Sequence, residues 1–132
     1  MTLKYNTTII ADRLTSLNTD IGINAILRIY TGLQPVSVAT AASGSVLVSL
    51  PCSATAFGAV SGGALTANAI TTTAASATGT AGCFRVFKAD GTTAVVDGSV
   101  STSGSDLNLN STSISATQNV SITSFVLTGA PV

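Results

Sequence analysis

Apolar residues recur at helical spacing in one stretch of the chain, close to its N-terminus. Four of them, three or four positions apart, form a single stripe: Ile10, Leu14, Leu17 and Ile21. Such a stripe is typical of an amphipathic helix. Thr7 or Thr8 is suited to cap its start, and Gly22 to end it. The pattern predicts a helix of about three turns over residues 8–21.

Beyond Gly22 the pattern changes to short apolar or alternating runs, which are typical of β-strands. These runs cover residues 25–31, 44–50, 64–70, 107–110 and 120–128, separated by segments rich in Gly, Pro, Ser and Thr. With the hairpin described below, about seven or eight strands are expected, so the fold is predicted to be a mainly β, jelly-roll-like β-sandwich. The predicted organisation is an N-terminal arm and helix, 1–22, followed by a single sandwich domain, 23–132.

The stretch 83–97 predicts a β-hairpin. Two apolar runs flank Asp90-Gly91, a pair that favours a two-residue type I′ turn. This register sets Phe87 opposite Ala94 and Arg85 opposite Val96. One face then carries Phe84, Val86, Lys88, Thr93, Val95 and Asp97, and the other carries Cys83, Arg85, Phe87, Ala94 and Val96. Because neither face is purely polar, we expect both to be covered, one of them by a partner in an assembly.

Two arginines lie inside apolar strands, where a charge must be paired, reach solvent or face a partner. They are Arg28 and Arg85. An arginine whose stem lies on the sheet and whose head reaches water is one interpretation, and contact with a partner is the other. Together with Phe87 and Val96, these arginines are the candidate partner-binding residues.

Charged residues make up 8% of the chain, and the formal net charge is zero. This balance disfavours binding to nucleic acid, which needs clustered Lys and Arg. No apolar run is long enough to span a membrane, and the N-terminus lacks the pattern of a signal peptide, so synthesis in the cytoplasm is expected. In that compartment Cys52 and Cys83 are predicted to be free thiols. A surface with so little charge favours a protein held in an assembly, although secreted β proteins are also rich in Ser and Thr.

The chain contains no His, Glu or Trp. The catalytic arrangements of Ser or Cys with His are therefore excluded, as are imidazole ligands for zinc. We predict no catalytic residues, no metal site and no cofactor. The carboxylates are all aspartates, Asp12, Asp20, Asp90, Asp97 and Asp106. Most lie at expected turns or a helix end, where Asp serves local hydrogen bonding.

Several short motifs give the chain a family resemblance. They are Leu27-Arg28-Ile29-Tyr30-Thr31-Gly32-Leu33-Gln34-Pro35 after the helix, Gly82-Cys83-Phe84-Arg85-Val86, Asp90-Gly91-Thr92, Asp97-Gly98-Ser99-Val100 and Asp106-Leu107-Asn108-Leu109. With these motifs the chain resembles the capsid decoration, or cement, proteins of tailed bacteriophages. The resemblance implies a jelly-roll or sandwich fold and a place on the outer surface of the virion capsid. It also implies a homo-dimer or homo-trimer that clamps neighbouring major capsid proteins.

Two other functions stay open at this stage. A phage tail or baseplate component has the same β-rich, charge-poor composition. A carbohydrate-binding sandwich, as in an adhesin or lectin, would need exposed aromatic side chains on which a sugar can stack.

Overall fold

The computed structural model describes residues 4–128, which form one helix and ten strands. The elements are α1 (Thr7–Ile21), β1 (Ile26–Thr31), β2 (Val46–Pro51), β3 (Ala64–Thr66), β4 (Thr73–Ala74), β5 (Gly79–Phe87), β6 (Ala94–Ser101), β7 (Leu107–Leu109), β8 (Ser113–Ile114), β9 (Asn119–Val120) and β10 (Ile122–Thr128).

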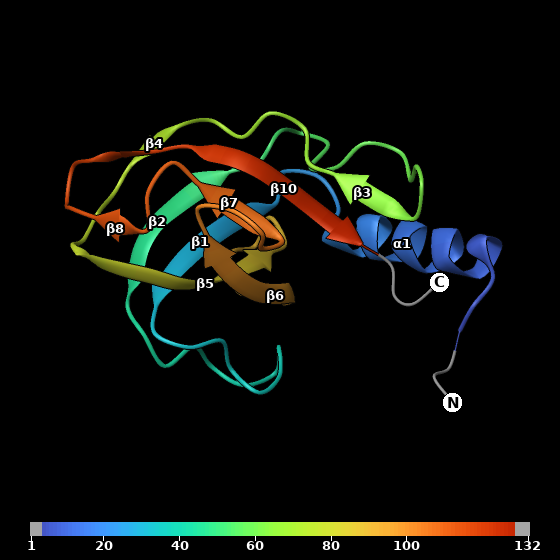
Figure 1. The fold of residues 1–132 in the computed structure, drawn as a ribbon, viewed down its shortest axis with the longest axis horizontal. Coiled ribbons are helices and arrows are strands. Elements are labelled where there is room, and N and C mark those ends of the chain that lie inside the picture. Colours follow the sequence, from blue (N-terminus) through green and yellow to red (C-terminus); the bar gives the residue numbers. More distant parts are fainter. Residues whose placement is uncertain (1–3, 129–132) are drawn as a thin grey trace.

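Most strands belong to one curled sheet, with the order β2-β1-β5-β6-β7-β10-β3 (Figure 1). β8 pairs with the start of β5, and β4 and β9 form a separate pair. β6 and β7 run parallel, whereas the other pairs are antiparallel. The curl sets β10 against β5, where the rings of Phe125 and Phe84 meet edge to face with centroids 5.0 Å apart. The predicted mainly β, sandwich-like fold with one N-terminal helix is confirmed.

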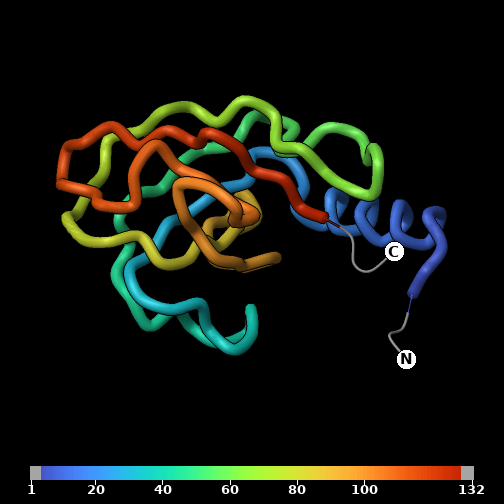
Figure 2. Tube along the Cα trace, viewed as in Figure 1, coloured from blue at the N-terminus to red at the C-terminus, as the bar shows by residue number. Residues whose placement is uncertain are grey.

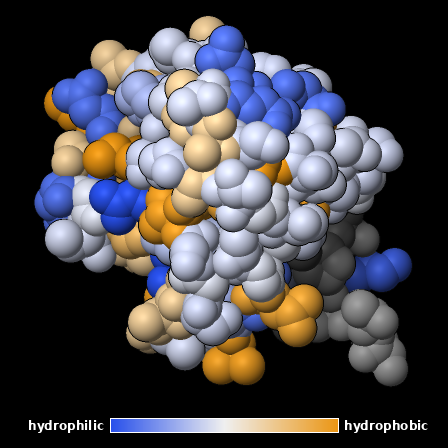
Figure 3. Space-filling model, turned by 90° about the vertical axis from the view of Figure 1, so that its left-hand side faces the viewer, coloured by the Kyte–Doolittle hydropathy of each residue, from blue (hydrophilic) through white to orange (hydrophobic). Residues whose placement is uncertain are grey.

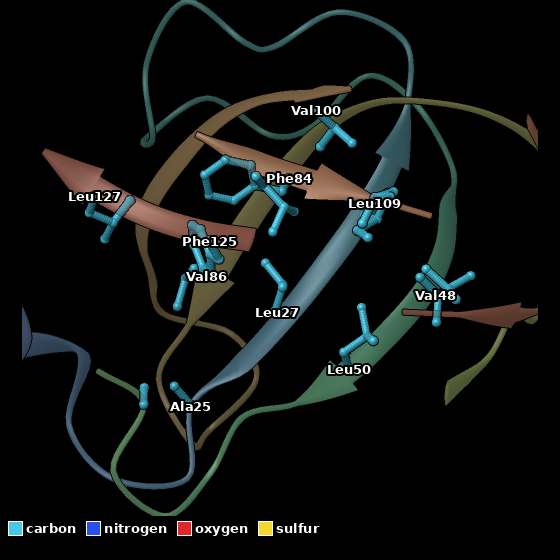
Figure 4. Close-up of a cluster of buried hydrophobic side chains, with 14 of the residues drawn as sticks. Ala25, Leu27, Val48, Leu50, Phe84, Val86, Val100, Leu109, Phe125 and Leu127 are labelled. Atoms are coloured by element: carbon cyan, nitrogen blue, oxygen red, sulfur yellow. The ribbon is translucent and has the colours of Figure 1, made fainter. Parts of the chain in front are cut away.

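The core lies inside the curl of the sheet. Figure 4 shows side chains from β1, β2, β5, β7 and β10 pointing toward one another, among them Leu27, Leu50, Val86, Leu109 and Phe125. Each of these five is at most 2% exposed. This inward packing is the main source of stability, because burial removes apolar surface from water.

The helix lies at one end of the molecule (Figure 2) and shares this core. Ile10, Leu14 and Ile21 are buried in the same apolar cluster as the strands. The helical stripe was therefore predicted correctly. The segment predicted as an N-terminal arm and helix and the residues of the sandwich bury their apolar side chains together.

The ends of α1 are fixed by local hydrogen bonds. The cap is Asn6, rather than Thr7 or Thr8 as predicted, because its Oδ1 accepts a hydrogen bond from the Ile9 amide at 2.8 Å. Gly22 ends the helix as expected. Its φ of 72° suits glycine, and its amide donates to the carbonyl of Asn18 at 3.2 Å.

The remaining strands follow the predicted pattern with several differences. The run at 120–128 is divided between β9, which pairs with β4, and β10, which pairs with β7 and β3. The run at 64–70 forms a strand over Ala64–Thr66 alone. The short strand β8 was not predicted, since two residues are too few to show a period.

The hairpin at 83–97 forms, but its turn is not the predicted type I′ turn. The Gly91 amide donates to the carbonyl of Lys88, and the Lys88 amide donates to that of Thr93, both at 2.9 Å. Gly91 has a φ of 71°, whereas Asp90 lies outside the left-handed region. The Asp90 carboxylate instead accepts hydrogen bonds from the amides of Thr92 and Thr93, each at 2.8 Å. These side-chain bonds stabilise a longer loop.

The register of the hairpin also differs from the prediction beyond Phe87. Phe87 lies opposite Ala94, as predicted, but an irregularity then places Val86 opposite Val96 and leaves Val95 unpaired. Such a bulge moves every later residue of the strand by one position. Arg85 therefore lies opposite Asp97, not Val96. Asp97 and Val96 have exchanged the faces predicted for them.

We predict that α1 and the sheet unfold as one cooperative unit. Leu14→Ala should lower the free energy of unfolding by about 2–5 kcal/mol, because it leaves a cavity in the shared core. Ile9→Ala, at a side chain that is 43% exposed, is the matched control and should cost less than about 1 kcal/mol. Urea unfolding followed by circular dichroism and tyrosine fluorescence would measure both values. Separate transitions for the two probes would contradict a shared core.

A second prediction concerns acid. Hydrogen bonds from the Thr93 side chain and from the Thr93 and Thr92 amides lower the pKa of Asp90 from 3.8 to about 2. Because the folded pKa is depressed, the stabilising contribution is present above about pH 4 and is lost as the pH falls through about 2. A carboxyl-detected NMR titration should give this pKa, and Thr93→Val should raise it. A midpoint near 4 in the wild type would show that the turn bonds do not form.

Candidate interaction site

The loop of residues 32–45, here called the strap, crosses the outer face of the β1–β5 pair and lies at the bottom of Figure 1. Beneath it, Tyr30, Cys83 and Phe87 form a second, smaller apolar cluster, against which Ala42 packs. The apolar outer face of the hairpin was expected to be covered by a partner. The chain's own strap covers much of it.

Both ends of the strap are held by close backbone approach. A Cβ atom on Gly82 would overlap the carbonyl oxygen of Gly32, and one on Gly44 would overlap that of Thr31. At the second end, the Thr31 amide donates to the Ser45 carbonyl at 3.0 Å. Glycine is required at such contacts because it has no side chain.

The middle of the strap is held by a buried ion pair. Nη2 of Arg85 lies 3.0 Å from Oδ2 of Asp97, and the two side chains are 7% and 5% exposed. The same nitrogen donates to the Thr40 carbonyl at 2.7 Å, and Nε2 of Gln34 donates to Oδ1 of Asp97 at 2.8 Å. Each member of the pair therefore contacts the strap, Arg85 at Thr40 and Asp97 at Gln34. Burying either charge alone would be costly.

Arg28 lies opposite Arg85 in the register of β1 and β5. Its Nη1 donates to the Gly91 carbonyl at 2.9 Å, and its guanidinium carbon lies 4.6 Å from the centre of the Phe87 ring. Two like charges in this position repel each other, and Asp97 offsets the repulsion at Arg85. Through its hydrogen bond to Gly91, Arg28 ties the hairpin loop to β1, which is an internal strand and not an edge.

The structure brings three of the four predicted contact residues together. Arg28, Arg85 and Phe87 share the strap face, where each has contacts within the chain. Val96 does not join them, because the bulge turns it toward the main core, opposite Val86. Arg85 and Phe87 also line a hollow beside the strap, together with Val38, Ala39, Ala41, Thr92 and Ala94.

The two cysteines lie in different apolar clusters and are free thiols. Burial raises the pKa of Cys52 to about 11. The pKa of Cys83 is raised by burial and by the nearby Asp97, and Arg85 partly offsets this rise. The Cys83 thiol contacts the Leu33 carbonyl at 3.8 Å. Both thiols are poor nucleophiles near neutral pH, since the reactive thiolate is scarce.

The outward side of the strap is apolar. Leu33 is 86% exposed and Val36 is 97% exposed. We call these two residues the strap apex. Large apolar side chains that lie exposed and close together are typical of an interaction surface.

Long segments of the chain, including the strap, carry no charge. No charged residue occurs between Arg28 and Arg85 or after Asp106. The strap, β2, β3, β4 and β7–β10 therefore carry none. Figure 3, coloured by hydropathy, shows a side of the molecule that is mostly pale, with hydrophilic side chains at its top and left and apolar side chains at its left and lower edge.

The acidic side chains and thiols of residues 4–128 do not gather into a metal site. No three potential metal ligands of the His, Cys, Asp or Glu type gather within this part of the chain. Asp90 and Asp97 serve the hairpin loop and the ion pair. In the same range, no helix has the length and apolarity needed to cross a membrane.

Comparison of the chain with protein-family models, curated proteins and solved structures found no match. The candidate site therefore rests on its own geometry.

Sequence reasoning missed the strap, which it treated only as a loop between two strands. One feature of the sequence points to it. Leu33, Val36 and Val38 are apolar residues within a segment bounded by Gly32 and Gly44. Which of them would point outward was not visible, because the inward contacts are made with residues more than forty positions away.

We predict that the buried ion pair holds the strap in place. Asp97→Ala should lower the free energy of unfolding by about 3–5 kcal/mol, because Arg85 is left buried and unpaired. The double variant Arg85→Met/Asp97→Leu should be more stable than Asp97→Ala, since it removes both charges. Urea unfolding would measure these differences. A loss below about 1 kcal/mol for Asp97→Ala, as for exposed pairs, would contradict the prediction.

Proposed function

We propose that this protein is a capsid decoration protein. It would bind the outside of a phage head, without catalysis, and stabilise contacts between major capsid proteins. The observation that carries this proposal is that the strap, β2, β3, β4 and β7–β10 contain no charged residue, so that whatever they expose is uncharged. The family resemblance of the sequence motifs supports it.

A surface of this kind suits burial against other proteins. Charged residues are depleted at the centre of protein interfaces, because each buried charge must be paired or pay for its desolvation. Small uncharged side chains avoid this penalty. On a symmetric shell, a modest contact is repeated at many equivalent sites, so that weak contacts reinforce the whole particle.

The burial of the aromatic residues argues against the carbohydrate-binding alternative. Five of the six aromatic side chains, Tyr30, Phe57, Phe84, Phe87 and Phe125, are at most 8% exposed. The sixth, Tyr5, is half-buried. The guanidinium carbon of Arg13 lies over the Tyr5 ring, 4.9 Å from the ring centre. None of them offers an open ring for stacking on a sugar. A tail or baseplate component shares the charge-free surface and is distinguished by experiment.

The proposal is tested by adding the purified protein to expanded phage heads that lack it. Sedimentation with the heads is expected, and so is greater resistance of the heads to heating. Immunogold labelling of whole virions should mark heads; labelling of tails would instead favour the tail component. Protein that stays in the supernatant and remains monomeric by light scattering would contradict the proposal.

A further inference from the structure

The strap apex stands out among the exposed apolar side chains of residues 4–128. Within that range, the large apolar side chains that are clearly exposed are Ile9, Ile23, Leu33 and Val36. The two most exposed of them, Leu33 and Val36, lie three positions apart on one loop. Ile9 and Ile23 are separate and lie near the two ends of α1.

The strap holds these two side chains outward. Its ends are fixed at Gly32 and Gly44, and its middle is tied to the sheet through the Gln34 side chain and the Thr40 carbonyl. The inward side of the strap combines these polar contacts with Ala42, which packs on the second cluster, and with Val38, Ala39 and Ala41, which line the hollow beside Arg85 and Phe87. A loop fixed in this way loses little freedom on binding, and such preorganisation favours affinity.

The chemistry of the apex defines its partner. No charged residue lies in the strap or in β2, which follows it. The apex therefore demands no opposite charge and suits an uncharged apolar recess. We propose that Leu33 and Val36 insert into such a recess on the outer surface of the shell protein. This inference rests on the proposed function and names the part of the molecule that makes the contact.

A second copy of this chain is a less suitable partner. The groove formed by residues 66–70 and 122–126 is an uncharged recess on the described part of the chain. It lies between the β3–β10 side of the sheet and the segment after β3, whereas the strap covers β1 and β5. A contact between two different surfaces of identical copies closes only if its rotation allows a ring; otherwise it grows into an open filament.

The test compares four variants on heads that lack the protein. Leu33→Asp and Val36→Asp should weaken binding at least about tenfold, because each puts a charge into an apolar contact. Ile23→Asp is the matched control. Ile23 is 69% exposed and precedes β1, at the end of that strand opposite to the strap. It should bind as the wild type does, and Leu33→Met should keep binding because it stays apolar.

Two further measurements make the outcome decisive. Thermal unfolding should be unchanged in all three Asp variants, since the side chains are exposed. Wild-type binding should change less than about twofold between roughly 50 and 500 mM salt, as expected for a contact without charges. If the wild type binds heads but the apex variants bind equally well, the inference is wrong and the proposed function stands. If the apex variants change only self-association in light scattering, the partner is a second copy and the inference is again wrong. If the wild type does not bind heads, the proposed function itself fails.

Discussion

The Arg85–Asp97 ion pair determines how the outer face of the sandwich is organised. A buried charge pair contributes little net stability when it is complete, but the loss of one partner is costly. Here each charge also binds the strap, Arg85 through the Thr40 carbonyl and Asp97 through Gln34. The position of the strap therefore depends on both charges of the pair.

The pair itself depends on the bulge at Val95. In a regular hairpin, Asp97 would lie on the core face among Phe84 and Val86, where no cation is available. The unpaired Val95 turns Asp97 to the strap face and brings Val95 and Val96 to the main core. One inserted residue thus satisfies the core and the ion pair together, which is a recognised use of bulges. Gly98 fits the same arrangement, since a Cβ there would lie 2.7 Å from the Phe84 ring.

The distribution of the few charged residues along the chain supports the proposed function. Arg28 and Arg85 are engaged in internal contacts. Long segments of the chain contain no charged residue. Such a surface has little electrostatic steering. It is suited to short-range contacts in which shape and apolar area matter, such as the seating of the strap apex in a neighbouring protein. If many copies bind one head, as proposed, no individual contact needs to be strong.

The sequence by itself determined the features that depend on neighbouring residues. The spacing of Ile10 and Leu14 predicted α1, alternation predicted most strands, and Asp90-Gly91 predicted where the hairpin reverses. The missing residue types excluded the common catalytic arrangements. Only the tertiary structure decided the bulge at Val95, the partner of Arg85 and the outward direction of Leu33. These features arise from contacts between segments far apart in the chain, where packing of the core and pairing of a buried charge outweigh local preference.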